Sequence, residues 1–338
     1  MTINLGATEI SGIKLGNTQI DSAYLGDTQV WGGSEPGELR ALKFECAGNQ
    51  TLGINQSSLG TITPNFEYSN DGQTWANWDI TTTLAFGNGV DLYVRGMNNI
   101  LANSSKYTTF VFSTSEPVNC SGNIMHLFDY TQDLTAFPTA EGSAGTKAMF
   151  YNCTQLVSAP KLPATTLLAR CYNLMFWNCT SLVHPPELPA TSLTEGCYHS
   201  MFMRCRVLNN PPALPATTLA NNCYFNMFYG CWGLTNAPSL PALNIPSSAY
   251  GYMFSGCTSL ASIPALPATF LGANCYAQMF DGCSLIKMSV TEVDEYTNEY
   301  TFGTNPSAYA YNMFRNTGGT FTGTANQTTY YTANTIIY

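Results

Sequence analysis

Residues 222–231 read NCYFNMFYGC, a stretch in which two cysteines flank a Met-Phe pair. The Met-Phe pair recurs along the chain at a constant interval of 26 residues. Its six copies are Met149-Phe150, Met175-Phe176, Met201-Phe202, Met227-Phe228, Met253-Phe254 and Met279-Phe280. A fixed period of this length predicts a repeat array, in which each unit buries its apolar face against its neighbours. Leu127-Phe128 precedes the array and Met313-Phe314 follows it at irregular spacing, so we interpret both pairs as end repeats.

Two cysteine positions recur together with the Met-Phe pair. Cysteine follows the pair at Cys153, Cys179, Cys205, Cys231, Cys257 and Cys283, and precedes it at Cys171, Cys197, Cys223 and Cys275. The fifth copy has Ala249 at the earlier position, and alanine preserves a small apolar side chain but cannot bind a metal. The chain also has no Cys-x-x-Cys and only three histidines, so zinc spacing is absent. We therefore predict no metal site and a core of free thiols packed with Phe150, Phe176, Phe202, Phe228, Phe254 and Phe280.

Each repeat unit is predicted to hold a short extended segment, a turn and a short helix. In residues 179–205, Pro186 lies in an extended segment whose prolines exclude a long hydrogen-bonded strand. Leu193, Cys197 and Met201 fall at positions i, i+4 and i+8, which is typical of one face of a helix. Asn or Gly before the second cysteine suits a left-handed helix end. Stacked units of this kind predict a leucine-rich-repeat-type solenoid, and hence a mixed β and α/β fold.

Four regions can be separated along the chain. Residues 1–33 repeat LGxTxI at a period of ten, which predicts short strands too few to bury their own apolar face. This segment is expected to attach the chain to a partner or to copies of itself. Residues 39–120 alternate apolar and polar positions around the hairpin signal SNDGQTW, which indicates a small β-sandwich. The repeat array occupies 121–315, and the Thr- and Tyr-rich residues 316–338 are expected to form a β cap.

Composition excludes several classes of protein. Only 10% of the 338 residues are charged, and the net charge is −9, so there is no basic surface for nucleic acid or anionic lipid. The N-terminus lacks the pattern of a classical signal peptide, and no apolar run approaches the length of a membrane span. We find no metalloprotease, nucleophile-elbow, phosphate-loop or dinucleotide motif, so neither an enzyme nor a cofactor is expected.

If the repeated positions form the core, a binding surface must lie where the copies differ. The candidate ligand-binding residues are Trp177, Met203, Phe225, Tyr229, Trp232 and Tyr252. Rigid aromatic side chains facing solvent can stack on sugars or anchor a protein partner. The same residues would suit packing between repeats or beneath a sister subunit. A second variable row on the extended segments, including His184, Glu187, Asn210 and Ala213, suits either a hydrogen-bonding surface or ordinary exposure. Sequence alone leaves the choice between the two faces open.

Residues 118–285, with VNCSGNIMHLF and near-copies of LPATTLAxxCYxxMFxGCTSL, resemble the leucine-rich repeats of the BspA-like family. This family is common in gut Bacteroidales and their phages. The stretches FEYSNDGQTW and LYVRG resemble the module that usually precedes such repeats, and the LGxTxI segment resembles the start of phage structural proteins.

The resemblance implies adhesion to a bacterial surface glycan or protein. Because no signal peptide or anchor is recognised, we expect a virion protein, such as a phage tail or head fibre. Residues 1–33 would then contact other virion proteins, and the resemblance to fibres suggests a homotrimer. A secreted or cell-surface bacterial adhesin is the first alternative, and a structural virion protein without receptor contact is the second.

Overall fold

The computed structural model describes residues 39–140, 142–286, 310 and 312–317, together with the backbone of six short strands outside these ranges. These strands are β1 (Ile13–Leu15), β2 (Thr18–Ile20), β3 (Ala23–Leu25), β4 (Thr28–Trp31), β16 (Glu299–Thr301) and β17 (Thr335–Ile337). The chain forms two compact units, Met1–Arg40 and Ala41–Tyr338. In the first unit, β1 pairs with β2 and β3 with β4, both antiparallel. The cap expected over 316–338 lies outside the described residues, apart from 316, 317 and β17.

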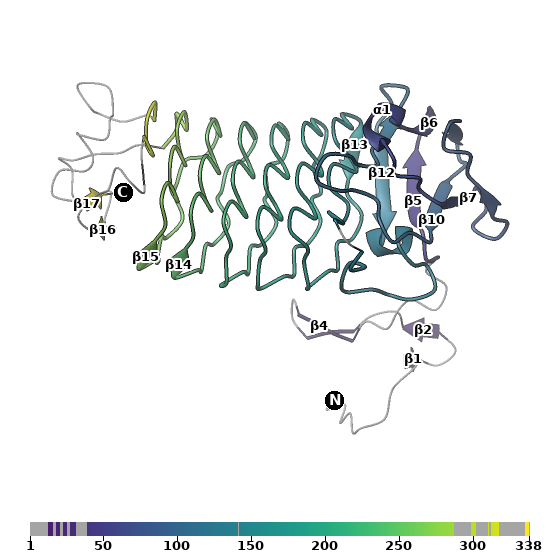
Figure 1. Cartoon of the computed structure of the whole chain (residues 1–338), viewed down its shortest axis with the longest axis horizontal. Helices are drawn as coiled ribbons and strands as arrows, with labels where there is room; N and C mark the ends of the chain where they lie inside the picture. Colours follow the sequence, from purple (N-terminus) through teal and green to yellow (C-terminus); the bar gives the residue numbers. More distant parts are fainter. Residues whose placement is uncertain are drawn as a thin grey trace. The chain divides into compact units, whose positions relative to one another are not determined.

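Two facing sheets open the second unit (Figure 1). One sheet has the order β13-β12-β5-β10-β7-β8 and the other β11-β6-β9. Their strands are β5 (Leu42–Cys46), β6 (Asn49–Ile54), β7 (Phe66–Ser69), β8 (Ala76–Asn77), β9 (Leu84–Gly87), β10 (Leu92–Gly96), β11 (Phe110–Phe112), β12 (Val118–Gly122) and β13 (Leu156–Ser158). Phe44 of the first sheet packs on Phe86 and Phe112 of the second, with ring centroids 6.3 and 6.0 Å apart. Alternating burial along these strands therefore builds a core between the sheets.

The sandwich closes the N-terminal end of the repeat core, and one hydrophobic core runs through both. Strand β13 of the first repeat pairs in parallel with β12, so the array extends the sheet. The Phe110 ring lies 5.5 Å from that of Phe150, and the Phe110 amide donates to the carbonyl of Met149 at 2.8 Å. Phe110 thus occupies the place that we expected for Leu127-Phe128. Leu127-Phe128 therefore does not continue the Met-Phe positions, because Phe128 packs edge-on against Phe137, although Asn123 and Ala136 on either side of it pair in parallel with the first repeat.

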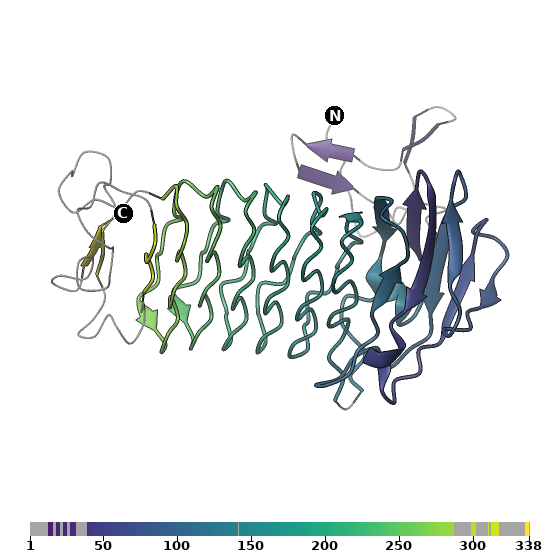
Figure 2. The same ribbon diagram turned by 90° about the horizontal axis from the view of Figure 1, so that it is seen from above.

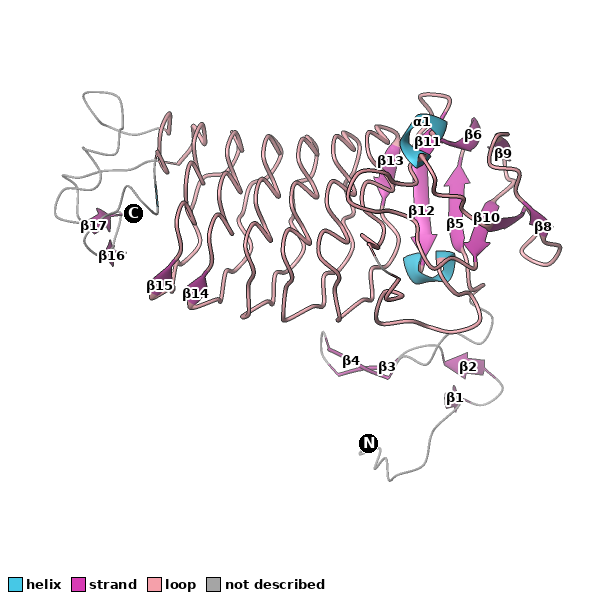
Figure 3. Cartoon of the chain, viewed as in Figure 1, coloured by secondary structure: helices cyan, strands magenta, loops and turns pink. Residues whose placement is uncertain are grey.

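The repeats are stacked coils made largely of turns (Figures 1 and 2). Every second amide in the Met-Phe segment donates to a carbonyl of the next coil, as Phe176 does to Met201 at 2.9 Å. The amides between them donate three residues back, as Met175 does to Tyr172 at 3.2 Å. Among the described residues there are two short helices, α1 (Gln56–Leu59) and the 3₁₀-helix η1 (Ile124–Leu127), and both lie at the sandwich end (Figure 3). The short helix predicted in each repeat is wrong, because no α-helix is described within residues 128–286.

The backbone angles explain why turns replace the helix. In the third coil, Gly196, Ser200 and Arg204 have φ of 58°, 54° and 64°. A residue with positive φ cannot continue a right-handed helix, so each one starts a new turn. The residue that follows each of these three is buried: Cys197, Met201 and Cys205. Turns of four residues therefore reproduce the i, i+4, i+8 pattern of burial that a helix would show.

Two columns of aromatic rings run along the stacked coils. In the phenylalanine column, Phe176 and Phe202 lie 5.6 Å apart at 6° between ring planes. In the tyrosine column, Tyr198 and Tyr224 lie 5.7 Å apart at 15°. The phenylalanine column continues to Phe314, which stacks on the ring of the sixth copy at 5.6 Å. The interpretation of Met313-Phe314 as an end repeat is therefore confirmed.

The extended sides of the coils carry few strands. The short parallel pair β14 (Asn244–Ile245) and β15 (Phe270–Leu271) joins two coils near the C-terminal end. Across the described residues the fold is mostly β, with several sheets and no closed barrel.

Candidate binding surface

The repeated cysteines belong to the scaffold. All ten are buried and carry free thiols. From the second coil onward, the thiol of the later cysteine donates to the carbonyl of the phenylalanine one coil earlier, as Cys205 does to Phe176 at 3.1 Å. Burial raises the pKa of the Cys197 and Cys231 thiols to about 12, which keeps these groups protonated at neutral pH. Among the described residues, no group of three or more His, Cys, Asp or Glu side chains is placed to hold a metal ion.

Side chains at one position of each turn segment form a ridge along the outside of the coils. Three aromatic residues and one methionine occupy the same position in successive coils, and we call these four side chains the aromatic ridge: Tyr151, Trp177, Met203 and Tyr229. The rings of Tyr151 and Trp177 are 4.5 Å apart and parallel to within 5°. All four side chains are partly exposed. The ridge therefore combines packing between coils, at Tyr151 and Trp177, with partial access to solvent, and its role in binding stays a prediction.

A second aromatic group lies beside the ridge. Phe225 lies between His199, which stacks on it at 5.2 Å, and Tyr252, whose ring is tilted against it at 5.4 Å. Gly251 provides the space, because a Cβ atom there would lie only 3.0 Å from the Phe225 ring. Burial lowers the pKa of His199, so its imidazole is neutral at physiological pH. Phe225 and Tyr252 thus mainly pack against neighbouring coils, with partly exposed edges.

Trp232 is the most exposed of the six candidates, at 49%. The guanidinium carbon of Arg206 lies 4.4 Å from its ring centroid. That of Arg204 lies 5.5 Å from the ring of Trp177. Both distances fall within the range of a cation–π contact. The sequence prediction missed the two arginines because it considered aromatic and methionine side chains; a signal was present, since Thr180 and Thr258 stand where the third coil has Arg206.

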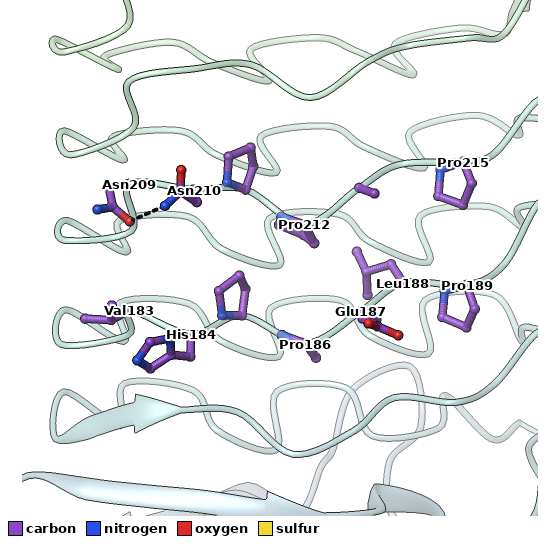
Figure 4. Close-up of a pocket in the computed structure, with 13 residues that line it drawn as sticks. Val183, His184, Pro186, Glu187, Leu188, Pro189, Asn209, Asn210, Pro212 and Pro215 are labelled. Atoms are coloured by element: carbon purple, nitrogen blue, oxygen red, sulfur yellow. Dashed lines mark hydrogen bonds between the residues drawn. The ribbon is translucent and has the colours of Figure 1, made fainter. Parts of the chain in front are cut away.

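A groove of about 690 Å³ lies on the other side of the coils, between the extended segments of the second and third repeats. The prolines of the two segments lie in register, and His184, Glu187 and Asn210 add polar groups (Figure 4). Ala213 also lines it. Four members of the second variable row are therefore brought together in one hollow, which the sequence did not distinguish from ordinary exposure.

Proline removes one possible backbone hydrogen bond at the groove. Between the first and second repeats, the amide of Ala159 donates to the carbonyl of His184 at 3.1 Å. The equivalent residue one repeat later is Pro185, which has no amide hydrogen to donate. No backbone hydrogen bond joins residues 185–190 to 211–216, both of which are fully described. The equivalent segments of the neighbouring coils, 159–164 with 185–190 and 211–216 with 237–242, likewise share no backbone hydrogen bond, so the feature that marks this pair is the extra proline at 185 and at 211.

None of the helices in the described part of the chain has the length and apolar character that a membrane span requires. Comparisons of the chain with protein-family models, with curated proteins and with solved structures found no match.

Proposed function

We propose that the chain is a non-enzymatic binding protein whose coils form a leucine-rich-repeat-type solenoid that contacts a bacterial surface. The observation that carries this proposal is the contrast between the inside and the outside of the coils. Inside, cysteine, methionine, phenylalanine and tyrosine recur at fixed positions. Outside, the residue type changes from coil to coil at the positions of the aromatic ridge, of Phe225 and Tyr252, and of Trp232. Constant packing with variable exposed aromatic residues favours recognition over catalysis.

The scaffold would hold the outward side chains in place before a ligand arrives. Backbone hydrogen bonds link neighbouring coils on the side of the aromatic ridge, and the two ring columns fill the core. Trp177 is further fixed between Tyr151 and Arg204. A preorganised aromatic surface loses little conformational entropy on binding, which raises affinity.

The buried thiols support assembly in a reducing compartment, as for a phage protein made in the bacterial cytoplasm. Twelve cysteines carry free thiols, ten of them in the repeat core. A chain folding in an oxidising compartment would risk wrong disulfides between such thiols. This favours a virion protein, a phage tail or head fibre, over a secreted or surface-displayed bacterial adhesin. Under this proposal the paired strands β1–β2 and β3–β4 attach the chain to other virion proteins or to copies in a homotrimer.

The test measures saturable binding of the fluorescent full-length protein to intact Bacteroidales cells and to capsule-deficient cells. Two variants replace residues with their equivalents from other coils: Tyr229→Ser, as at Ser255, and Trp232→Thr, as at Thr258. The matched control on the opposite side is the groove variant His184→Ala/Asn210→Ala. We expect the ridge-side variants to weaken binding and the groove variant to leave it unchanged.

Three other outcomes favour different conclusions. Loss of binding in the groove variant alone would move the receptor site to the extended side of the coils. Failure of the unmodified protein to bind any strain would favour the structural virion protein. Release of reducing ends from purified capsule would contradict a non-enzymatic role.

A further inference from the structure

The third to fifth coils carry an unusual distribution of charge. Between Glu195 and Asp281 the sequence contains no aspartate, glutamate or lysine, and its two arginines are Arg204 and Arg206. The whole chain, in contrast, has a net charge of −9. Two cations two residues apart therefore create a local positive surface on an acidic protein.

The two arginines point to tryptophans on opposite neighbouring coils. They flank the buried Cys205, and both are exposed. Arg204 lies over Trp177 of the preceding coil, and Arg206 lies over Trp232 of the following coil. We call these four side chains, Trp177, Arg204, Arg206 and Trp232, the arginine–tryptophan site.

Neither Arg204 nor Arg206 forms an ion pair with a described residue, whereas other arginines of the structure do. Arg95 pairs with Glu67 at 2.7 Å and Arg170 with Glu195 at 3.2 Å. The coil that carries Arg204 and Arg206 offers no carboxylate of its own beyond residue 195. The two guanidinium groups thus keep their hydrogen-bond donors for an external acceptor.

We infer that the arginine–tryptophan site binds an acidic polysaccharide through the carboxylates of its sugar units. A planar guanidinium donates two parallel hydrogen bonds to a carboxylate, which matches this group better than a neutral hydroxyl. A guanidinium stacked on an indole is held in place and less hydrated, so it loses less on binding. The exposed ring of Trp232 offers an apolar surface to the carbon face of a sugar. This inference rests on the proposed function, since it names the class of receptor for the same side of the coils.

Other polyanions fit the site less well. Nucleic acid binding takes many phosphate contacts spread over a basic surface, whereas this site has two cations on a chain of charge −9. Anionic membranes attract clusters of about four to eight basic residues. An acidic polysaccharide that carries a carboxylate on every one or two sugar units can bind with few cations, and the site supplies two on one coil.

The experiment measures binding of the full-length protein to immobilised hyaluronan, alginate and oligogalacturonate, each beside its carboxyl-reduced form. The variant Arg204→Gly/Arg206→Thr carries the residues found at the same positions in other coils, Gly230 and Thr258, and so preserves the fold. The charge-matched control is Lys161→Gln/Arg170→Gln, which removes two cations from the first two coils. Thermal unfolding of each variant checks that the coils remain folded.

We expect at least one acidic polysaccharide to bind, its carboxyl-reduced form to bind at least tenfold more weakly, and raised salt to weaken the interaction. The Arg204→Gly/Arg206→Thr variant should lose about tenfold or more in affinity, while the control stays within about twofold. Equal binding of reduced and unreduced polysaccharides would overturn the inference, as would equal losses in variant and control. If single-stranded DNA bound equally tightly, the site would recognise polyanions in general and the inference of an acidic glycan would fail.

Cell binding separates this inference from the proposed function. If the double variant still binds host cells as the unmodified protein does, the receptor-binding proposal stands and the carboxylate inference fails. If the unmodified protein binds acidic polysaccharides but no cells, the receptor-binding proposal fails instead.

Discussion

The thiol of Cys205 donates a hydrogen bond of 3.1 Å to the carbonyl of Phe176 on the preceding coil. The same carbonyl accepts the amide of Cys179 at 3.2 Å. Each such carbonyl therefore joins a turn of its own coil to the side chain of the next coil. The relationship repeats along the array, as for Cys231 with Phe202 and Cys257 with Phe228. It explains why a small side chain that can also donate a hydrogen bond suits this position.

Burial of these thiols should make them unreactive in the folded protein. Eleven of the twelve cysteines are buried, and Cys46 is partly exposed. Since burial raises the pKa of the Cys153, Cys179 and Cys205 thiols, little thiolate is present at pH 8. We expect about one thiol per chain to react rapidly with a thiol reagent in native buffer and all twelve to react in unreduced denaturant. Fewer than about four reactive thiols after denaturation would show that disulfides form.

The same pKa shifts predict a loss of stability in alkali. In the unfolded chain a thiol ionises near pH 8.5, whereas burial raises the pKa of Cys197 and Cys231 to about 12. Between these values the unfolded state releases protons that the folded state retains, so the free energy of unfolding falls as pH rises. Each thiol contributes a slope of about 1.4 kcal/mol per pH unit. Urea unfolding at pH 7, 8, 9 and 10 should show little change up to pH 8 and a steep fall above it.

A cysteine-deleted variant is the control for this slope. The variant Cys197→Ala/Cys223→Ala follows the substitution found naturally at Ala249, so the coils should still form. Removing two thiols should reduce the slope above pH 9 by about 3 kcal/mol per pH unit. Equal slopes in the variant and the unmodified protein would contradict a role of the buried thiols.

The sequence identified the repeat length, the buried cysteines and the core phenylalanines, because each depends on identity between copies, but it did not predict that the phenylalanine rings stack in a column. The turn structure escaped prediction, because the spacing of Leu193, Cys197 and Met201 suits a helix and a series of four-residue turns equally. The two structures differ in the residue before each buried position, which has a positive φ in the turns. At residue 204 the sequence hides this difference, because arginine is not typical of a positive φ.

The candidate site was also predicted only in part. The outward position of Trp177 and Tyr229 follows from the repeat frame. The contacts of Arg204 and Arg206 with tryptophans depend on how far each long side chain reaches toward a neighbouring coil. The positions of residues in the repeat do not give that reach. Sequence likewise marked the prolines but could not show that a groove lies there between the second and third coils.

The phenylalanine column should dominate the stability of the coils. Phe202 is fully buried between Phe176 and Phe228, at 5.6 and 5.7 Å. Phe202→Ala should lower the free energy of unfolding by about 3–5 kcal/mol, because it leaves a cavity and removes two ring contacts. Phe270→Ala is the control, since Phe270 is 70% exposed and should change stability little. Similar melting temperatures for the two variants would contradict the structure of the column.

The left-handed backbone at Arg204 predicts opposite effects for two substitutions at one position. Its φ is 64°, and the equivalent residues Gly230 and Gly256 have φ of 69° and 74°. Arg204→Gly should therefore leave stability unchanged or raise it by up to about 1 kcal/mol, because glycine adopts this conformation without strain. Arg204→Val should lower it by about 1–2 kcal/mol, because a β-branched side chain crowds the backbone at positive φ.

Both variants remove the same charge, so a difference in their unfolding free energies does not come from the charge but from placing a β-branched side chain at a positive φ. If valine and glycine at residue 204 gave equal stability, the series of left-handed turns would be wrong at this coil. If both variants were folded and both lost affinity for acidic polysaccharides, the loss would be caused by removal of the Arg204 guanidinium and not by a change in the backbone at residue 204.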